Sequence, residues 1–154
     1  MVDTLKVLPL LDVNLHVFVS AESDLAKRES MDPRDLLNEQ IAMYDGSYLK
    51  WLIHLMQQHV NGLDILFYST NQELIREFVL NKKAISIDTI SEKITNPYIN
   101  SKEVVSIPLV LDFPHNSYLG LVMKMEDHTS HYFQELVNLI DALIKKEISQ
   151  AILT

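Results

Sequence analysis

The 154-residue sequence contains no cysteine and only three glycines. Without cysteine there is no disulfide framework, no thiolate ligand for a metal ion and no cysteine nucleophile. The glycines, Gly46, Gly62 and Gly120, stand far apart, so the chain cannot build the glycine-rich loop that holds phosphate in nucleotide-binding folds. These absences exclude disulfide scaffolds, P-loop enzymes and dinucleotide-binding domains.

Long apolar runs and an excess of basic residues are also missing. No apolar stretch approaches the roughly 18 residues that cross a bilayer, and the start, MVDTLKVLPLL, is unlike a signal peptide because it carries Asp3 and a single lysine. The formal net charge is −8 at pH 7, which repels a phosphate backbone. We therefore expect a cytoplasmic protein without a membrane partner that does not bind nucleic acid by itself.

The sequence alternates strand patterns with helix patterns, which is typical of the α/β class. Runs rich in β-branched and aromatic residues predict strands at 15–20, 40–44, 63–69, 84–88, 104–113 and 118–125. Helical spacing and capping residues predict helices at 32–38, at 48–59, from Thr70, from Thr89 to before Pro97, and from Ser130.

Several of these elements carry finer expectations. Thr70 and Glu73 have the spacing of a capping box, and Pro108 indicates that the strand at 104–113 leaves one sheet and enters another. One face of the helix at 48–59 is predicted to hold Tyr48, Trp51, Leu52, Leu55, Met56 and His59. The helix after Ser130 is predicted to bury Phe133, Leu136, Val137, Ile140, Leu143 and Ile144.

Three stretches, in this order along the chain, are similar to one protein family. In the first stretch, His16–Tyr44, a strand leads into Leu25-Ala26-Lys27-Arg28 and Asp35-Leu36. In the second stretch, Asp64–Thr89, the helix ELIREFVLN leads into Ala84-Ile85-Ser86-Ile87. The third stretch, Ser106–Ile140, contains SIPLVLDF and LGLVMK. Together they resemble the effector-binding domain of LysR-type transcriptional regulators over nearly the whole chain. The chain departs from the family's pattern at Lys82-Lys83, where glycines are usual, and at Thr89, where proline is frequent.

This resemblance implies one half of a periplasmic-binding-protein-like fold of type II, with a mixed sheet flanked by helices. Residues 15–105 would form the second subdomain, and residues 1–14 and 106–154 would be remnants of the first, with crossings at Leu10–Leu15 and Ser106–Leu111. It also implies that the chain senses a small-molecule effector, is not an enzyme and needs no cofactor. DNA would be bound through a winged helix-turn-helix that this sequence does not contain.

The family binds its effector between the subdomains, and open α/β sheets in general bind ligands beyond the carboxyl ends of their strands. Three loops of this sequence follow predicted strands and precede helices, so free backbone N–H groups at those helix starts suit a small carboxylate. The candidate effector-binding residues are Tyr44, Asp45, Gly46, Ser47, Ser69, Thr70, Asn71, Asp88 and Thr89. A purely structural role is the alternative: we expect Thr70 to be a cap and Tyr48 to be core, while Ser47 suits either role.

The sequence gives only weak signals for a metal site built from histidines or for a set of catalytic residues. His54 and His59 are not spaced for one helix face. His128 and His131 lie three apart near acidic residues, but we expect a solvated helix start there and no metal site. No G-x-S-x-G elbow is present, so we predict no catalytic residues.

The helix at 48–59 has apolar residues around more than one narrow stripe. A helix this wide indicates a second buried face, and we expect Trp51, Ile53 and Val60 to lie in a homodimer interface or, equally well, under neighbouring elements of the same chain. Two other functions remain open at this point. One is a free-standing α/β dimerisation or antagonist module, and the other is a small α/β enzyme that uses His128 or His131.

Overall fold

In the computed structural model, residues 5–90, 102–113, 117–126 and 130–153 are described. They fall into two compact units. The first unit comprises residues 5–13, 117–126 and 130–153, and the second comprises residues 14–90 and 102–113. The sequence predicted a boundary at 105–106, whereas the described part of the second unit reaches residue 113.

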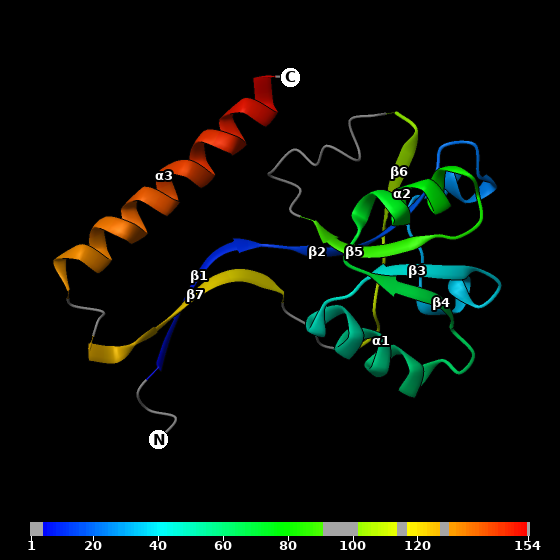
Figure 1. Cartoon of the computed structure of the whole chain (residues 1–154), viewed down its shortest axis with the longest axis horizontal. Coiled ribbons are helices and arrows are strands. Elements are labelled where there is room, and N and C mark those ends of the chain that lie inside the picture. The colour runs from blue at the N-terminus through cyan, green and yellow to red at the C-terminus, as the bar shows by residue number, and fades with distance from the viewer. Residues whose placement is uncertain (1–4, 91–101, 114–116, 127–129, 154) are drawn as a thin grey trace. The chain divides into compact units, whose positions relative to one another are not determined.

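The second unit contains most of the regular elements (Figure 1). They are β2 (Asn14–Ser20), the 3-10 turns η2 (Asp24–Lys27) and η3 (Pro33–Leu36), β3 (Gln40–Tyr44), α1 (Ser47–His59), β4 (Asp64–Ser69), α2 (Gln72–Leu80), β5 (Ser86–Ile90) and β6 (Val104–Pro108). Strands β5, β2 and β6 form an antiparallel sheet in that order, and β3 and β4 form a parallel pair. An isolated parallel bridge between Ile41 and Ile85 joins the two sets of strands. The predicted mixed α/β architecture is confirmed.

Strand β2 lies at the centre of its sheet and is covered on both faces. Leu15, Val17 and Val19 point into the main core with α1, while Phe18 packs with Val79 of α2 on the other face. Strand β6 pairs with β2 at an edge of the sheet and ends at Pro108, which suits a residue without a backbone donor. The stretch predicted as a single strand over 104–113 therefore ends earlier than expected.

Turn chemistry sets the ends of the two helices in this unit. Helix α1 ends at His59, and Gly62 shortly after it adopts the left-handed conformation with φ 101°. After α2 the left-handed position is occupied by Lys82, with φ 56°. Lys82, one of the two lysines that stand where glycines are usual in the resembling family, thus has a conformation that costs free energy for any residue with a Cβ.

The first unit contains β1 (Leu5–Asp12), β7 (Tyr118–Lys124) and α3 (His131–Leu153). Strands β1 and β7 form an antiparallel two-stranded sheet with an irregularity between Pro9 and Leu11. Strand β1 was not predicted. No helix in the described part of the chain, α3 included, is long and apolar enough to cross a membrane.

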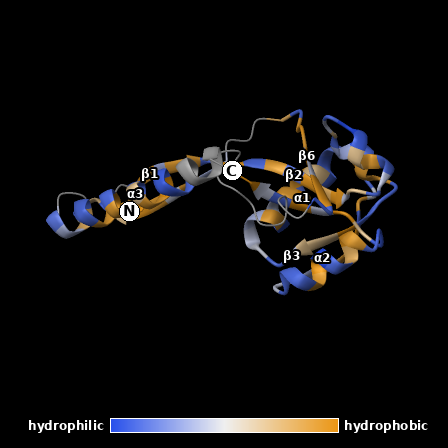
Figure 2. Cartoon of the chain, turned by 90° about the horizontal axis from the view of Figure 1, so that it is seen from above, coloured by the Kyte–Doolittle hydropathy of each residue, from blue (hydrophilic) through white to orange (hydrophobic). Residues whose placement is uncertain are grey.

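The burial predicted for α3 is wrong. None of the six apolar residues is buried: Leu136 and Leu143 are 45% and 54% exposed, and Phe133, Val137, Ile140 and Ile144 are half-buried. Figure 2 shows hydrophobic residues interleaved with hydrophilic ones along this helix. Helical spacing identifies which face is apolar, but it does not show that the chain supplies a surface to cover that face.

The helix predicted after Thr89 lies outside the described residues.

Candidate functional site

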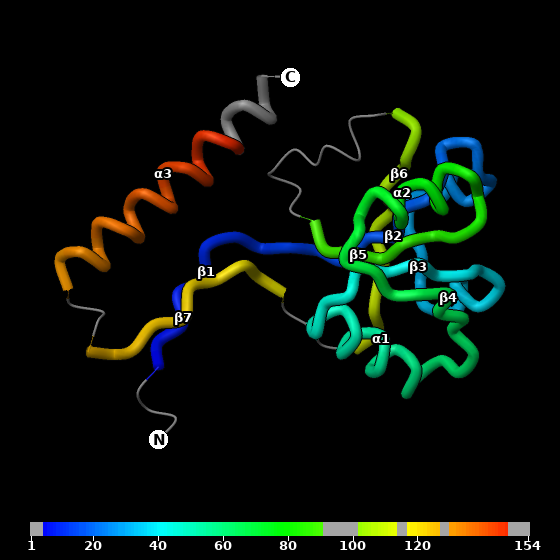
Figure 3. Tube along the Cα trace, in the orientation of Figure 1, coloured from blue at the N-terminus to red at the C-terminus, as the bar shows by residue number. Residues whose placement is uncertain are grey.

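The carboxyl ends of β3 and β4 bring two of the three predicted loops together. Because the two strands are parallel, both end at one edge of the sheet, and α1 and α2 begin directly beyond them (Figure 3). The backbone N–H of Asp45 donates to the carbonyl of Ser69 at 3.0 Å, which joins the loops directly. This edge is where ligands bind in open α/β sheets.

The third candidate pair, Asp88 and Thr89, does not lie in a loop. The sequence predicted a strand that ends at residue 88, but β5 runs from Ser86 to Ile90 and contains both residues, which pair with β2. The parallel bridge between Ile41 and Ile85 places Asp88 about as far along β5 as Tyr44 is along β3. The first two predicted loops therefore lie at strand ends, and the third does not.

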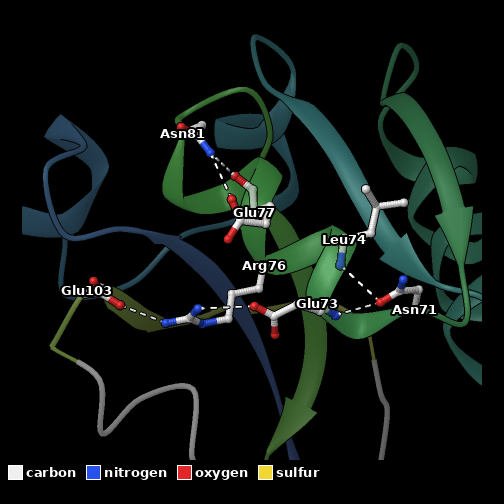
Figure 4. Close-up of polar contacts among 7 residues, drawn as sticks. All are labelled: Asn71, Glu73, Leu74, Arg76, Glu77, Asn81 and Glu103. Atoms are coloured by element: carbon white, nitrogen blue, oxygen red, sulfur yellow. Dashed lines mark hydrogen bonds and ion pairs between the residues drawn. The ribbon is translucent and has the colours of Figure 1, made fainter.

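The two helix starts at this edge differ in how their backbone donors are satisfied. At α2, Asn71 is the N-cap, and its side-chain oxygen accepts from the N–H groups of Glu73 and Leu74 at 3.1 and 3.2 Å (Figure 4). At α1, Gly46 is the N-cap, and it has no side chain that could accept from the first turn. The dipole of α1 adds a partial positive charge at this helix start.

The predicted capping box at Thr70 and Glu73 is wrong by one residue. Asn71 caps the helix, and its own N–H donates to the Ser69 hydroxyl at 3.0 Å. Asparagine is as good an N-cap as threonine is, or better, and the chain uses the later of two adjacent candidates. Thr70 therefore does not have the capping role that was its structural alternative.

The sequence analysis did not predict a group of interacting side chains, two of them charged, beside the start of α1. Lys50, in the first turn of α1, forms an ion pair with Asp45, and its Nζ lies 5.0 Å from the centroid of the Tyr68 ring on β4. Both charged side chains remain nearly half exposed. An acid just before a helix and a lysine in its first turn are a signal for such a pair, but the tyrosine is supplied by the neighbouring strand and follows only from the fold.

The buried face of α1 differs from the predicted one. Leu49, Leu52, Ile53 and Met56 are buried, whereas Tyr48 and Trp51 are 41% and 51% exposed and their rings lie 5.9 Å apart. The apolar residues offered two overlapping faces, and the core selected the one that points at β2 and β3. Tyr48 is therefore not core, and it borders the candidate site.

The observed buried face of α1 also bears on the residues that were expected in a dimer interface or under neighbouring elements of the same chain. Ile53 and Val60 are 2% and 9% exposed, because they pack within the second unit, so they are not available to a partner. Trp51 alone among the three residues presents its ring to solvent.

Asp88, in the middle of β5, carries a largely buried carboxyl group. Burial raises the pKa of Asp88, and the N–H of Thr89, which donates to its Oδ1 at 2.7 Å, partly opposes the rise. Across the strand pair it faces His16, a buried side chain that shares a hydrogen bond of 2.7 Å with the Ser106 hydroxyl. The sequence placed His16 in a strand but gave no sign of these partners.

The histidines considered for metal or catalysis lie apart. His54 contacts Gln58, His59 bonds to the Leu55 carbonyl and stacks on Phe113 with ring centroids 4.9 Å apart, and His131 pairs with Glu135 at 3.1 Å. His128 is outside the described residues. Among the residues that are described, no three metal-ligating side chains gather.

Comparison with known proteins identifies the architecture. A model of the LysR substrate binding domain matches residues 2–144. The effector binding domain of QuiR in complex with shikimate superposes with a TM-score of 0.68 at 20% identity, covering 94% of this chain and 67% of that one. The regulatory domain of MetR from N. meningitidis gives 0.75 at 17% identity, covering 94% and 66%. The CcmR regulatory domain of Synechocystis PCC6803 in complex with 2-PG gives 0.71 at 18% identity, covering 92% and 68%.

The chain thus spans about two thirds of these solved domains, and half of the chain solved for HinK, a regulator from Pseudomonas aeruginosa. No curated protein matches the sequence.

Proposed function

Because the chain belongs to the LysR substrate-binding family of regulatory domains, which are not enzymes, we propose how its own residues sense an effector. The site lies at the carboxyl ends of β3 and β4, beside the start of α1, with Asp88 and Thr89 of β5 as further candidate residues. The observation that carries the proposal is the positive charge at the start of α1, where the helix dipole and Lys50 lie beside the strand ends.

The charges at this edge favour a small carboxylate as the effector. The first-turn N–H groups of α1 and the Ser47 hydroxyl are hydrogen-bond donors, and the helix dipole adds a partial positive charge there. Lys50 adds a full positive charge. Tyr44, Tyr48 and Ser69 border the same place and offer aromatic surface and a hydroxyl to the rest of the molecule.

The effector acts through a shift in populations. In a two-part fold, a ligand that binds one arrangement of the parts more tightly than another favours that arrangement by the difference in binding free energy. A DNA-binding region outside this sequence would respond to the shift in the cytoplasm, within a homo-oligomer in which Trp51 is a candidate contact.

The test is a titration of the ¹⁵N-labelled chain with shikimate, and then with acetate and benzoate as simple carboxylates, followed by amide chemical shifts. Millimolar binding, worth about 4 kcal/mol, is detectable in this way. We expect the largest shifts at the amides of Ser47, Tyr48 and Leu49, and a loss of those shifts in Lys50→Ala.

The matched control is Lys27→Ala, which removes an exposed lysine paired with Asp24 in η2. It should leave the titration unchanged. Shifts confined to other parts of the chain, or an equal loss in both lysine variants, would contradict the placement of the site.

A further inference from the structure

A small cavity lies within the second unit, at the end of the strands opposite to the candidate effector site. It has a volume of about 60 Å³ and is lined by the end of β2, the residue before β3 and the turn between α2 and β5. Strand β3 is five residues long and separates the two places, so they are roughly 15 Å apart. The cavity is therefore distinct from the candidate effector site.

The turn between α2 and β5 places two lysines at the cavity. The backbone N–H of Lys82 donates to the carbonyl of Val79 at 3.0 Å, and those of Lys83 and Ala84 donate to the carbonyl of Phe78 at 2.9 and 3.3 Å. The backbone donors of the turn are thus satisfied internally, and the lysine side chains are what the turn offers to the cavity. Lys82 keeps a left-handed conformation that glycine adopts without strain, which points to a role for its side chain.

Charges of both signs border the cavity. Lys83 contacts the Phe78 ring, with its Nζ 5.8 Å from the ring centroid, and it forms no ion pair with any residue that the structure describes. Glu39 is half-buried, and within the described part of the chain its carboxylate has neither a hydrogen bond nor an ion pair. A ligand with an ammonium group and a carboxylate pairs with both charges, whereas Glu39 repels a simple anion.

Two serine hydroxyls at the cavity are oriented for donation to such a carboxylate. The Ser20 side chain is buried, and its Oγ accepts from the N–H of Glu22 at 3.3 Å. The Ser23 Oγ accepts from the N–H of Leu25 at 3.2 Å. In both bonds the hydroxyl oxygen is the acceptor, so each hydroxyl keeps its own proton to donate.

The volume of the cavity limits the size of the ligand. Because a single water needs about 10–15 Å³ of such space, the cavity has room for roughly five non-hydrogen atoms, the size of glycine or alanine. We propose that this cavity binds a small α-amino acid as its zwitterion. Lys82, Lys83 and the two serine hydroxyls hold the carboxylate, and Glu39 holds the ammonium group.

The test is a titration of the full ¹⁵N-labelled chain with glycine up to about 20 mM, which detects millimolar binding. We expect saturable shifts at the amides of Ser20, Ser23 and Ala84. Acetate and methylamine each carry one of the two charges, and leucine exceeds the volume of the cavity. At these three amides, all three compounds should bind at least tenfold more weakly than glycine.

Two variants assign the charges. Glu39→Gln should weaken glycine binding at least tenfold and leave the weak response to acetate unchanged, and Lys83→Gln should weaken the binding of both compounds. The matched control is Glu29→Gln, which neutralises an exposed acid outside the cavity. It should leave glycine binding unchanged, and so should Lys50→Ala, which alters only the candidate effector site.

Four results would overturn the proposal. The first is the absence of saturable shifts at the three amides, and the second is binding of acetate there as tight as that of glycine. The third is an equal loss in Glu39→Gln and Glu29→Gln. The fourth is a loss of glycine binding in Lys50→Ala, which would place glycine at the start of α1 instead.

Discussion

The two units of this chain use similar apolar patterns with opposite results. In the second unit, Leu36, Ile41 and Met56 are fully buried, and β2 is covered on both faces. In the described part of the first unit only Leu11 and Met123 are buried. An amphipathic pattern therefore shows which surface is able to be buried, but whether it is buried depends on what else packs there.

This difference divides the roles of the units. A two-stranded sheet such as β1–β7 is marginal by itself in water, whereas a sheet covered on both faces carries most of the hydrophobic stabilisation. We infer that the second unit holds the stability and the candidate effector site. The described part of the first unit buries too little apolar surface to contribute much of the stability.

The largest expected effect comes from truncating matched apolar residues in the two units. Met56→Ala should lower the free energy of unfolding by about 2–5 kcal/mol, because it leaves a cavity in the core. Leu139→Ala should change it by less than about 0.5 kcal/mol in the monomer. Urea unfolding at low protein concentration measures both changes. An equal decrease in the free energy of unfolding for the two variants would contradict the difference between the units.

The next effect separates the two candidate caps of α2 within the second unit. Asn71→Ala should cost about 1 kcal/mol, because two backbone donors lose their acceptor. Thr70→Ala is the control and should cost little. A larger loss for Thr70→Ala in thermal unfolding would restore the capping box predicted from the sequence.

A smaller effect, with the opposite sign, is expected at the turn after α2. Lys82→Gly should stabilise the chain by about 0.5–1 kcal/mol, since glycine adopts the left-handed conformation without the cost that lysine bears. Lys83→Gly is the matched control and should not stabilise, because Lys83 does not have a positive φ. Destabilisation by Lys82→Gly in urea unfolding would show that the Lys82 side chain contributes more than its conformation costs.

The smallest effects are pH-dependent and differ in sign between two acids of the second unit. The pKa of Asp35 is lowered, first by the Asp32 N–H that donates to its carboxylate and then by Arg28, so its stabilisation is present above its ordinary pKa and lost as pH falls. The pKa of Asp88 is raised by burial, so its ionised form destabilises the fold as pH rises above its ordinary pKa.

Asp35→Asn should therefore destabilise the chain at neutral pH and have little effect in acid. Asp88→Asn should be neutral or stabilising at neutral pH. Unfolding curves at pH 7 and at pH 3.5 compare the two, and the same sign for both variants at pH 7 would contradict this assignment.

Patterns local in sequence predicted the strands and helices of the second unit well. The bounds predicted for 40–44 are those of β3, and α1 begins one residue before the prediction. Because β3 and β4 were recognised as strands that precede helices, the candidate loops followed from the general geometry of α/β sheets. The resemblance to a known family supplied the rest of the site prediction.

The predictions that failed concerned features that depend on contacts between helices and strands. Pro9 interrupts the strand pattern in the sequence of β1, so this strand is recognised only from its pairing with β7. The buried side of α1 was ambiguous between overlapping apolar faces, and the contact of Lys50 with Tyr68 joins a helix to a strand that the sequence does not place side by side. The exposure of the apolar residues of α3 was missed because spacing alone does not show whether another surface covers them.

Native-state hydrogen exchange tests the central contrast most directly, since amides exchange according to the local free energy of opening. We predict that amides of β2, β3 and β5 are strongly protected and that those of β7 and α3 exchange faster. Equal protection of both units would contradict the account.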